Sequence, residues 1–350
     1  MRIVLDDIKC KSDLYPFTLT RSTADIRVGI LTIREKWELL LNKKIVTLSE
    51  IDNKEIGKDV KTLPANILPS LELVKALKPP EHINWQKANP IHIQYPWQIF
   101  ENNDATIRED FDIITKKRKS KKVSPTNTII GKKVFLEKGA SVEHCILNAS
   151  TGPIYIGKNA QVMEGCIIRG PFAMCEGSIL KMGTKIYGAT TLGPYCTVGG
   201  EIKNSVFFGY SNKSHDGYLG DSVIGEWCNL GAGTSNSNIK NTAGAVKIWN
   251  EFTTQYVNAG NKCGLLMGDY SRAAINTSFN TGSVVGIASN VFFNGLPPTF
   301  IKSFSWGNKK YELEKALEHI ENWKKLKGKI LSVEEKNILS DIYHQNNNNA

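Results

Sequence analysis

A single histidine stands in a segment rich in small and polar residues. His215 lies within Gly200–Asp221, where Gly, Ser and Asn recur, and Glu201 and Lys203 precede it there. Histidine is the side chain most often used as a general base, because an imidazole ordinarily titrates near neutral pH. The segment is therefore a candidate site for proton transfer. The non-catalytic alternative is a turn histidine that is hydrogen-bonded to nearby backbone.

A six-residue repeat surrounds this segment and must position it. The same frame occurs before the main series, from Ile130, and after it, from Ile224. A period of six fits neither a helix nor a simple alternating strand. It is typical of a solenoid in which three short strands make one triangular coil, and binding sites of solenoids tend to lie where the repeat is interrupted. The uninterrupted series of aliphatic residues is Ile156, Val162, Ile168, Met174, Leu180, Ile186, Leu192 and Val198.

The segments on either side of the repeat have other patterns. Near the N-terminus, Arg2–Leu5 predicts a short strand, and apolar spacing predicts a helix over Ser22–Leu41. After the repeat, Leu313–Leu326 and Val333–Tyr343 predict two helices. A Ser-x-x-Glu capping box at 332–335 fits the start of the second helix.

The hexads resemble the hexapeptide repeats of acyltransferases. This resemblance implies a mainly β fold: a left-handed parallel β-helix with a small N-terminal α/β domain and C-terminal helices. We expect a reduced nucleotidyltransferase-like domain at residues 1–115, a basic linker at 116–128, the β-helix acyltransferase domain at 129–307 and a helical tail at 308–350.

A longer motif around the histidine resembles one family of bifunctional enzymes. The run Lys213-Ser-His-x-x-Tyr-Leu-Gly-Asp is followed by Ile-Gly and by Asn229-Leu-Gly-Ala-Gly-Thr-x-x-x-Asn238. It is similar to the acetyltransferase half of glucosamine-1-phosphate N-acetyltransferase / N-acetylglucosamine-1-phosphate uridylyltransferase. The runs 16–21, 27–37 and 300–307 resemble a divergent bacterial branch with a shortened N-terminal domain.

The resemblance implies a role for individual residues of this chain. His215 matches the general base that takes a proton from the sugar amine as it attacks the acetyl thioester, and Glu201 matches the carboxylate that orients it. Lys203 matches a cation that holds the sugar phosphate, whereas Lys185 falls where the family carries an arginine and lacks its bidentate fork. The remaining matches position the sugar or the tetrahedral oxygen, although asparagine also suits the tight corners of a β-helix: Tyr218, Asn229 and Asn238.

The first domain departs from the family's pattern. A uridylyltransferase needs a glycine-rich loop after its first strand, where backbone N–H groups approach the nucleotide phosphates. This chain has Leu5-Asp-Asp-Ile-Lys-Cys-Lys-Ser there, with no glycine before Gly29. We therefore favour a degenerate remnant, with Mg²⁺ as a cofactor only if nucleotidyl transfer is retained. Weak candidates for nucleotide binding are Asp6, Asp7, Arg21, Arg27 and Lys36.

Composition and charge exclude several other classes. The net charge is +10, but most of this excess belongs to one run, Lys116–Lys122, and the remainder fits small phosphorylated ligands better than a nucleic acid. No stretch approaches the roughly 18 consecutive apolar residues of a membrane span, and the acidic start of the chain does not fit a signal peptide. Seven cysteines without a CxxC pair favour neither disulfides nor a metal site. We expect a cytoplasmic protein.

The leading hypothesis is an N-acetyltransferase that uses acetyl-coenzyme A and acts on an amino-sugar phosphate, with glucosamine 1-phosphate as the expected substrate in sugar-nucleotide biosynthesis. The resemblance also implies a homotrimer with sites between subunits. One alternative is a sugar-1-phosphate nucleotidyltransferase that uses the N-terminal domain. The other is a non-catalytic β-helix scaffold, for which the combination of His215, Glu201 and Lys203 has no evident use.

Overall fold

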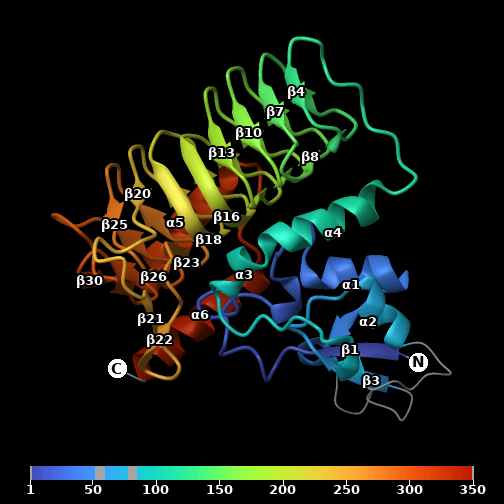
Figure 1. The fold of residues 1–350 in the computed structure, drawn as a ribbon. Helices are drawn as coiled ribbons and strands as arrows, with labels where there is room; N and C mark the ends of the chain where they lie inside the picture. The colour runs from blue at the N-terminus through green and yellow to red at the C-terminus, as the bar shows by residue number, and fades with distance from the viewer. Residues whose placement is uncertain (1, 52–59, 78–84, 349–350) are drawn as a thin grey trace.

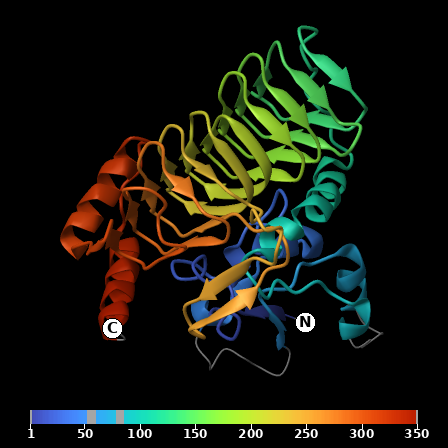
Figure 2. The same cartoon turned by 60° about the vertical axis from the view of Figure 1, so that its left-hand side comes forward.

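The computed structural model describes residues 2–51, 60–77 and 85–348. A long solenoid of short strands extends over a smaller α/β part, and two C-terminal helices cover one end of the solenoid (Figures 1 and 2). The predicted fold class, a parallel β-helix with a small N-terminal α/β domain and C-terminal helices, is confirmed. The division at residues 115 and 128 stays a prediction.

The N-terminal part is a small parallel sheet flanked by helices. Its three strands have the order β2-β1-β3, and β1 pairs with both neighbours in parallel. The elements are β1 (Arg2–Asp6), η1 (Thr23–Asp25), α1 (Ile33–Leu41), β2 (Val46–Thr47), η2 (Leu48–Glu50), β3 (Val60–Pro64), α2 (Leu71–Ala76), η4 (Trp85–Ala88), α3 (Gln98–Glu101) and α4 (Asn103–Thr115).

The single helix predicted over Ser22–Leu41 is wrong in its first half. Only η1 and α1 are helical, and the chain between them turns through Gly29 at φ +81°. A Cβ on Gly29 would lie 2.4 Å from a carboxylate oxygen of Asp110, because this turn packs directly onto α4. The same carboxylate accepts a hydrogen bond from the Ile30 N–H at 2.8 Å. Tertiary packing therefore overrides the apolar helical spacing.

The solenoid has three parallel faces. The first face contains β4 (Thr128–Ile130), β7 (Ile146–Asn148), β10 (Ile167–Arg169), β13 (Lys185–Tyr187) and the opening residues of β16 (Glu201–Gly209) and β18 (Tyr218–Glu226). β20 (Ser235–Asn236) pairs with β25 (Ser278–Phe279) beyond β18. The second face contains the closing residues of β16 and β18 together with β5 (Val134–Leu136), β8 (Ile154–Ile156), β11 (Phe172–Met174), β14 (Thr190–Leu192), β23 (Leu265–Met267), β26 (Ser283–Val285) and β28 (Phe300–Ile301).

The third face is a ten-stranded sheet. Nine of its strands follow one another coil by coil, and the last adds an antiparallel edge. They are β6 (Ser141–Val142), β9 (Gln161–Val162), β12 (Ile179–Leu180), β15 (Thr197–Val198), β17 (Asn212–Lys213), β19 (Asn229–Leu230), β24 (Arg272–Ala273), β27 (Asn290–Val291), β29 (Ser305–Trp306) and β30 (Lys309–Lys310). A hairpin of β21 (Lys247–Asn250) and β22 (Gln255–Asn258) projects from the solenoid before β23.

The repeat residues fill the interior of the coils. Each of the eight aliphatic residues from Ile156 to Val198 is at most 2% exposed. Successive coils place aliphatic residues beside one another. For example, Leu180 pairs with Val162 of the preceding coil and with Val198 of the following coil. Burying an aliphatic side chain contributes roughly 1.5–3 kcal/mol, so stacking of these residues is the main stabilisation of the solenoid.

The N-terminal part and the solenoid share one hydrophobic core. Val206 and Phe208 of β16 and Val223 of β18 are buried in the same cluster as residues of β1 and α1. The basic run also contacts the solenoid, since Lys121 N–H donates to the Leu136 carbonyl at 2.8 Å. The two parts of the chain therefore form a continuous packed unit.

Two helices, α5 (Leu313–Lys325) and α6 (Val333–Asn348), confirm the predicted C-terminal helices. The predicted capping box is present: Ser332 Oγ accepts from Glu335 N–H at 3.1 Å, and Ser332 N–H donates to the Glu335 carboxylate at 2.8 Å. Within the described residues, no helix is long and apolar enough to cross a membrane.

Candidate active site

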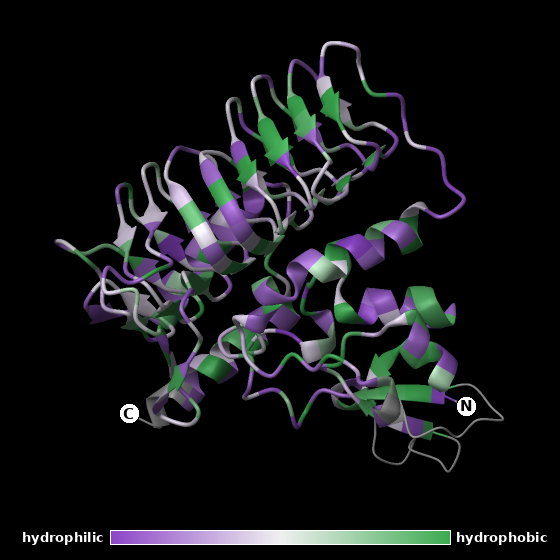
Figure 3. Ribbon diagram, in the orientation of Figure 1, coloured by the Kyte–Doolittle hydropathy of each residue, from purple (hydrophilic) through white to green (hydrophobic). Residues whose placement is uncertain are grey.

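The outward surface of the first face changes character along the solenoid. Ile146 and Ile167 occupy one outward row at 38% and 49% exposure, and the next residue of this row is Lys185. The row continues with Glu201 and Tyr218. Figure 3 shows the same change from hydrophobic colour on β7 and β10 toward polar colour on β13 and β16. The polar side chains of this row therefore begin at Lys185, near the end of the regular repeat, and continue on the coils that interrupt it.

Three residues predicted for the site are direct neighbours on this face. Lys185, Glu201 and Tyr218 lie in register on β13, β16 and β18, so their α-carbons are about 4.8 Å apart from strand to strand. Their side chains point outward because the next residue of each strand points into the core. Those inward residues, at most 2% exposed, are Ile186, Ile202 and Leu219.

Lys203 occupies a second outward row beside the first. Its register neighbours are Tyr187 on β13 and Gly220 on β18, and the side chain of Lys203 is exposed. A Cβ on Gly220 would lie 2.2 Å from the Tyr218 hydroxyl oxygen, so the tyrosine lies over this glycine. The missing side chain at position 220 therefore makes room for the tyrosine next to the lysine.

The tyrosine hydroxyl is held by a polar network. Asn238 Nδ2 donates to the Tyr218 hydroxyl at 3.2 Å and also to the Asp221 carboxylate. The other oxygen of Asp221 accepts from Asn204 Nδ2 at 2.6 Å, and Asp221 is 4% exposed. Burial, with the nearby charges of Asp221 and Glu201, raises the pKa of Tyr218 to about 12. Tyr218 therefore keeps its proton at neutral pH and can donate a hydrogen bond.

His215 lies at the corner that joins the third face to the first, between β17 and β18. Its side chain is exposed, and its main-chain carbonyl accepts from Lys213 Nζ at 2.9 Å. Asn229 lies on the other side of this corner, on the third face, in register with Asn212 and Arg272. The structure thus gathers Lys185, Glu201, Lys203, Tyr218 and Asn238 on or beside the first face, with His215 at its edge and Asn229 beyond that edge.

Sequence reasoning missed three residues of this region. Asp221 accepts from Asn238, Asn204 donates to Asp221, and Lys213 contacts the main chain of His215. A signal for the first two was present, because Asn204 and Asp221 are separated by the same 17 positions as two in-register residues, Glu201 and Tyr218. Lys213 stands at a repeat position that otherwise carries an aliphatic residue, and this exception is visible in the sequence.

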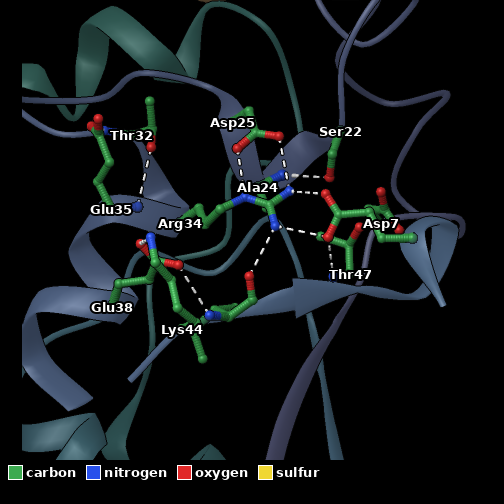
Figure 4. Close-up of polar contacts among 12 residues, drawn as sticks. Asp7, Ser22, Ala24, Asp25, Thr32, Arg34, Glu35, Glu38, Lys44 and Thr47 are labelled. Atoms are coloured by element: carbon green, nitrogen blue, oxygen red, sulfur yellow. Dashed lines mark hydrogen bonds and ion pairs between the residues drawn. The ribbon is translucent and has the colours of Figure 1, made fainter. Parts of the chain in front are cut away.

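The carboxylates proposed for nucleotide binding are engaged in local structure. Asp7 accepts hydrogen bonds from Ser49 N–H at 3.1 Å and from Ser49 Oγ at 2.6 Å. Although burial raises the pKa of Asp7, these hydrogen bonds hold it below its ordinary value. Asp6 accepts from Ile8 N–H at 3.2 Å and pairs with Lys9. In the same region, Arg34 pairs with the carboxylate of Asp25 (Figure 4). Arg34 also pairs with the carboxylate of Glu50.

The three cations proposed for nucleotide binding are bound within the protein. Arg21 pairs with Asp269 and lies 3.2 Å from the Glu226 carboxylate. Arg27 donates to the Ile30 carbonyl. Lys36 is 1% exposed and contacts the carboxylates of Glu109 and Asp110 at 2.8 and 2.9 Å. The structure does not bring these cations and the two aspartates together.

Within residues 2–51, 60–77 and 85–348, no group of three or more His, Cys, Asp or Glu side chains is arranged to hold a metal ion. The seven cysteines are free and buried.

Comparisons with known proteins give one family model and several relatives that are similar to this chain. Residues 2–76 and 50–119 match a family model described as sugar nucleotidyl transferase. Bifunctional protein GlmU of Methanocaldococcus jannaschii is 35% identical over 86 residues, which are 25% of this chain and 21% of the relative. The resemblance predicted from the sequence is confirmed.

Further relatives give the same result. Bifunctional protein GlmU of Rippkaea orientalis is 33% identical over 114 residues, 32% of this chain and 22% of the relative. That of Methanococcus maripaludis is 33% identical over 113 residues, 32% of this chain and 27% of the relative. The matched part of the chain spans 21% to 27% of the length of these relatives. A solved structure, the polySia specific acetyltransferase NeuO, aligns at a TM-score of 0.26 and 10% identity over 53% of this chain and 82% of that chain.

Proposed function

We propose that the chain is an N-acetyltransferase that moves an acetyl group from acetyl-coenzyme A to the amine of an amino-sugar phosphate, with glucosamine 1-phosphate as the substrate. The observation that carries the proposal is the register of Lys185, Glu201 and Tyr218 on one face, next to the corner that bears His215. A base, a carboxylate, cations and a protonated hydroxyl are thereby grouped on neighbouring coils.

The proposed reaction begins with proton transfer. His215 takes a proton from the neutral sugar amine as its nitrogen attacks the carbonyl carbon of the thioester. A C–N bond forms, and the negative charge on the tetrahedral oxygen is stabilised by hydrogen-bond donors. The C–S bond then breaks, the amide product is left on the sugar, and the thiolate receives a proton from the imidazolium of His215.

The remaining residues bind the substrate. Lys203 and Lys185 provide positive charge for the phosphate, and both side chains are exposed. Tyr218 and Asn238 contribute a donor pair whose geometry is fixed by Asp221. Glu201 lies between Lys185 and Tyr218 in the outward row, where it can orient the imidazole or pair with its positive charge.

A surface groove next to the site offers a place for the acyl donor in this proposal. It has a volume of about 900 Å³ and lies beside the segment that carries Asn238. Its size is within the range of small-molecule sites, and its lysines suit the phosphates of a coenzyme. We propose this groove for acetyl-coenzyme A, and a homotrimer as the assembly. Lining residues include Ser237, Lys240, Lys247, Tyr256, Asn280 and Thr281.

A second candidate, nucleotidyl transfer on a sugar 1-phosphate, is favoured by the family-model match to residues 2–76 and 50–119. Mg²⁺ would be required for that reaction. Against it stands the engagement of Arg21, Arg27 and Lys36 in contacts within the protein. We therefore place acyl transfer first.

The test is a thiol-release assay with acetyl-coenzyme A and glucosamine 1-phosphate. Wild-type protein should release free thiol only when the sugar phosphate is present, and His215→Ala should be slower by about 100-fold or more. His144→Ala is a matched control, because His144 is also an exposed corner residue of the solenoid. Equal rates for wild type and His215→Ala, or no release by wild type, would reject the proposal in favour of a scaffold or nucleotidyl transfer.

A further inference from the structure

A lysine occupies a position that the solenoid otherwise fills with aliphatic residues. Lys213 on β17 pairs in register with Val198, and Val198 pairs with Leu180. Lys213 is 1% exposed, as buried as the aliphatic residues of the same inward row. Its hydrocarbon stem continues the stack, but its ammonium group lies inside the protein.

Main-chain oxygens from the same corner of two successive coils hold the ammonium group. Lys213 Nζ donates to the carbonyl oxygen of His215 at 2.9 Å and approaches that of Gly199 at 3.4 Å. Gly199 follows β15, and His215 follows β17, so the two carbonyls belong to successive coils at the same corner. The lysine therefore connects the corner that bears the histidine to the corner beneath it.

The two corners are packed backbone against backbone. A Cβ on Gly199 would lie 2.7 Å from the Ser214 carbonyl oxygen, and one on Gly200 would lie 3.0 Å from that of His215. Gly200 also has a φ of +81°, which side-chain-bearing residues rarely adopt. Neither position tolerates a side chain without movement of the corner that carries His215.

Packing alone does not explain a lysine at this place. Burial lowers the pKa of Lys213 to about 8, against the opposing effect of Asp216, so the charged form is less favourable here than in water. An aliphatic residue would fill the row without this penalty, as Val198 does one coil earlier. A buried cation of this kind marks a candidate functional residue.

We propose that Lys213 is the positioning residue for His215, by fixing the main chain of its corner through the His215 and Gly199 carbonyls. Within the described residues, the imidazole of His215 makes no hydrogen bond, so its direction depends on the backbone that carries it. Fixing this backbone sets the place of His215 at the edge of the first face. The inference rests on the proposed function, in which His215 is the general base.

The test variant is Lys213→Met, which keeps the length of the side chain and removes the charge. We expect a melting temperature equal to or above that of wild type, because a buried charge has been removed. We expect kcat to fall by at least about tenfold, since small displacements of a catalytic group are costly, while KM for the sugar phosphate stays within about twofold. Val198→Met, in the same row one coil earlier, is the control and should leave kcat nearly unchanged.

A structural role predicts the reverse pattern. If Lys213→Met lowers the melting temperature and leaves kcat per folded molecule at the wild-type value, the proposal is wrong. A second measurement does not depend on acyl transfer: the NMR amide and imidazole signals of residues 214–217. We expect these signals to broaden or split in Lys213→Met, whereas sharp signals at wild-type positions overturn the proposal. Wild-type protein without transferase activity would reject the proposed function, while the NMR comparison would still decide the role of Lys213.

Discussion

Asn238 Nδ2 donates to the hydroxyl of Tyr218 at 3.2 Å and at the same time to the carboxylate of Asp221. The contact joins the start of the long excursion between β20 and β23 to the first face of the solenoid. It also connects two residues that the motif had placed in the site independently. The Asp221 carboxylate holds the Asn238 amide, and through it the Tyr218 hydroxyl, which is the basis of the first two predictions.

Replacing Asn238 by Ala removes the donor to Tyr218. We expect KM for the amino-sugar phosphate to rise about tenfold, which corresponds to the loss of one hydrogen bond of about 1.4 kcal/mol. The measurement is steady-state kinetics with acetyl-coenzyme A held saturating. Asn261→Ala, an exposed residue of the same excursion that does not line the proposed coenzyme groove, is the control and should keep the wild-type KM. An unchanged KM in Asn238→Ala would remove this residue from the substrate site.

Asp221→Asn tests the acceptor at the centre of the network. The carboxylate accepts from both Asn204 and Asn238, whereas an amide has only one acceptor oxygen. Because the site is buried, we expect a loss of about 1–3 kcal/mol in the free energy of unfolding, with KM raised as in Asn238→Ala. Chemical denaturation and kinetics on the same samples measure both. Wild-type stability together with wild-type KM would show that the network is dispensable.

Lys213 makes the stability of the protein depend on pH. Its pKa is about 8 in the folded protein and 10.5 as an ordinary value, so between these limits the unfolded chain binds more protons than the folded one. Stability therefore rises with pH from about 8 to 10.5, by about 3 kcal/mol at most. The difference in unfolding free energy between wild type and Lys213→Met, measured across this range, isolates the effect. A difference that does not change with pH contradicts the prediction.

Arg21 joins the N-terminal segment to the solenoid through a buried ion pair. Its partner Asp269 is 1% exposed and also accepts from the Glu226 N–H at 2.7 Å. Arg21→Met leaves this carboxylate without its cation, so we expect about 3–5 kcal/mol of destabilisation in a denaturation experiment. Lys9→Met, which removes a surface cation whose side chain is 88% exposed, should change stability by less than about 1 kcal/mol. A similar loss in the free energy of unfolding for the two substitutions would show that the buried Arg21–Asp269 pair does not stabilise the protein more than a surface ion pair does.

The solenoid and its C-terminal helices could be predicted because their signals are local. Inward aliphatic residues such as Leu180 recur at a fixed spacing, and the capping box at 332–335 is visible within one turn of chain. The helix expected over Ser22–Leu41 failed because Gly29 packs against Asp110, a contact between residues far apart in sequence. No periodicity reports such a contact.

The site was predictable only in part, for a related reason. The motif named Glu201 and Tyr218, but their alignment with Lys185 depends on coils shorter than three hexads, which only the register reveals. The role of Lys213 depends on the hydrogen bond from its ammonium group to the carbonyl of His215. The lysine was visible in the sequence, but this hydrogen bond was not.

The most direct measurement is the identity of the product. Wild-type protein, acetyl-coenzyme A and glucosamine 1-phosphate are incubated together, and the sugar is examined by mass spectrometry and proton NMR while free thiol is counted. We predict one N-acetylated sugar phosphate for each thiol released, and a rate reduced about 100-fold or more in His215→Ala. Thiol release without an N-acetylated sugar, or equal product from His215→Ala, would contradict acyl transfer by His215 at this site.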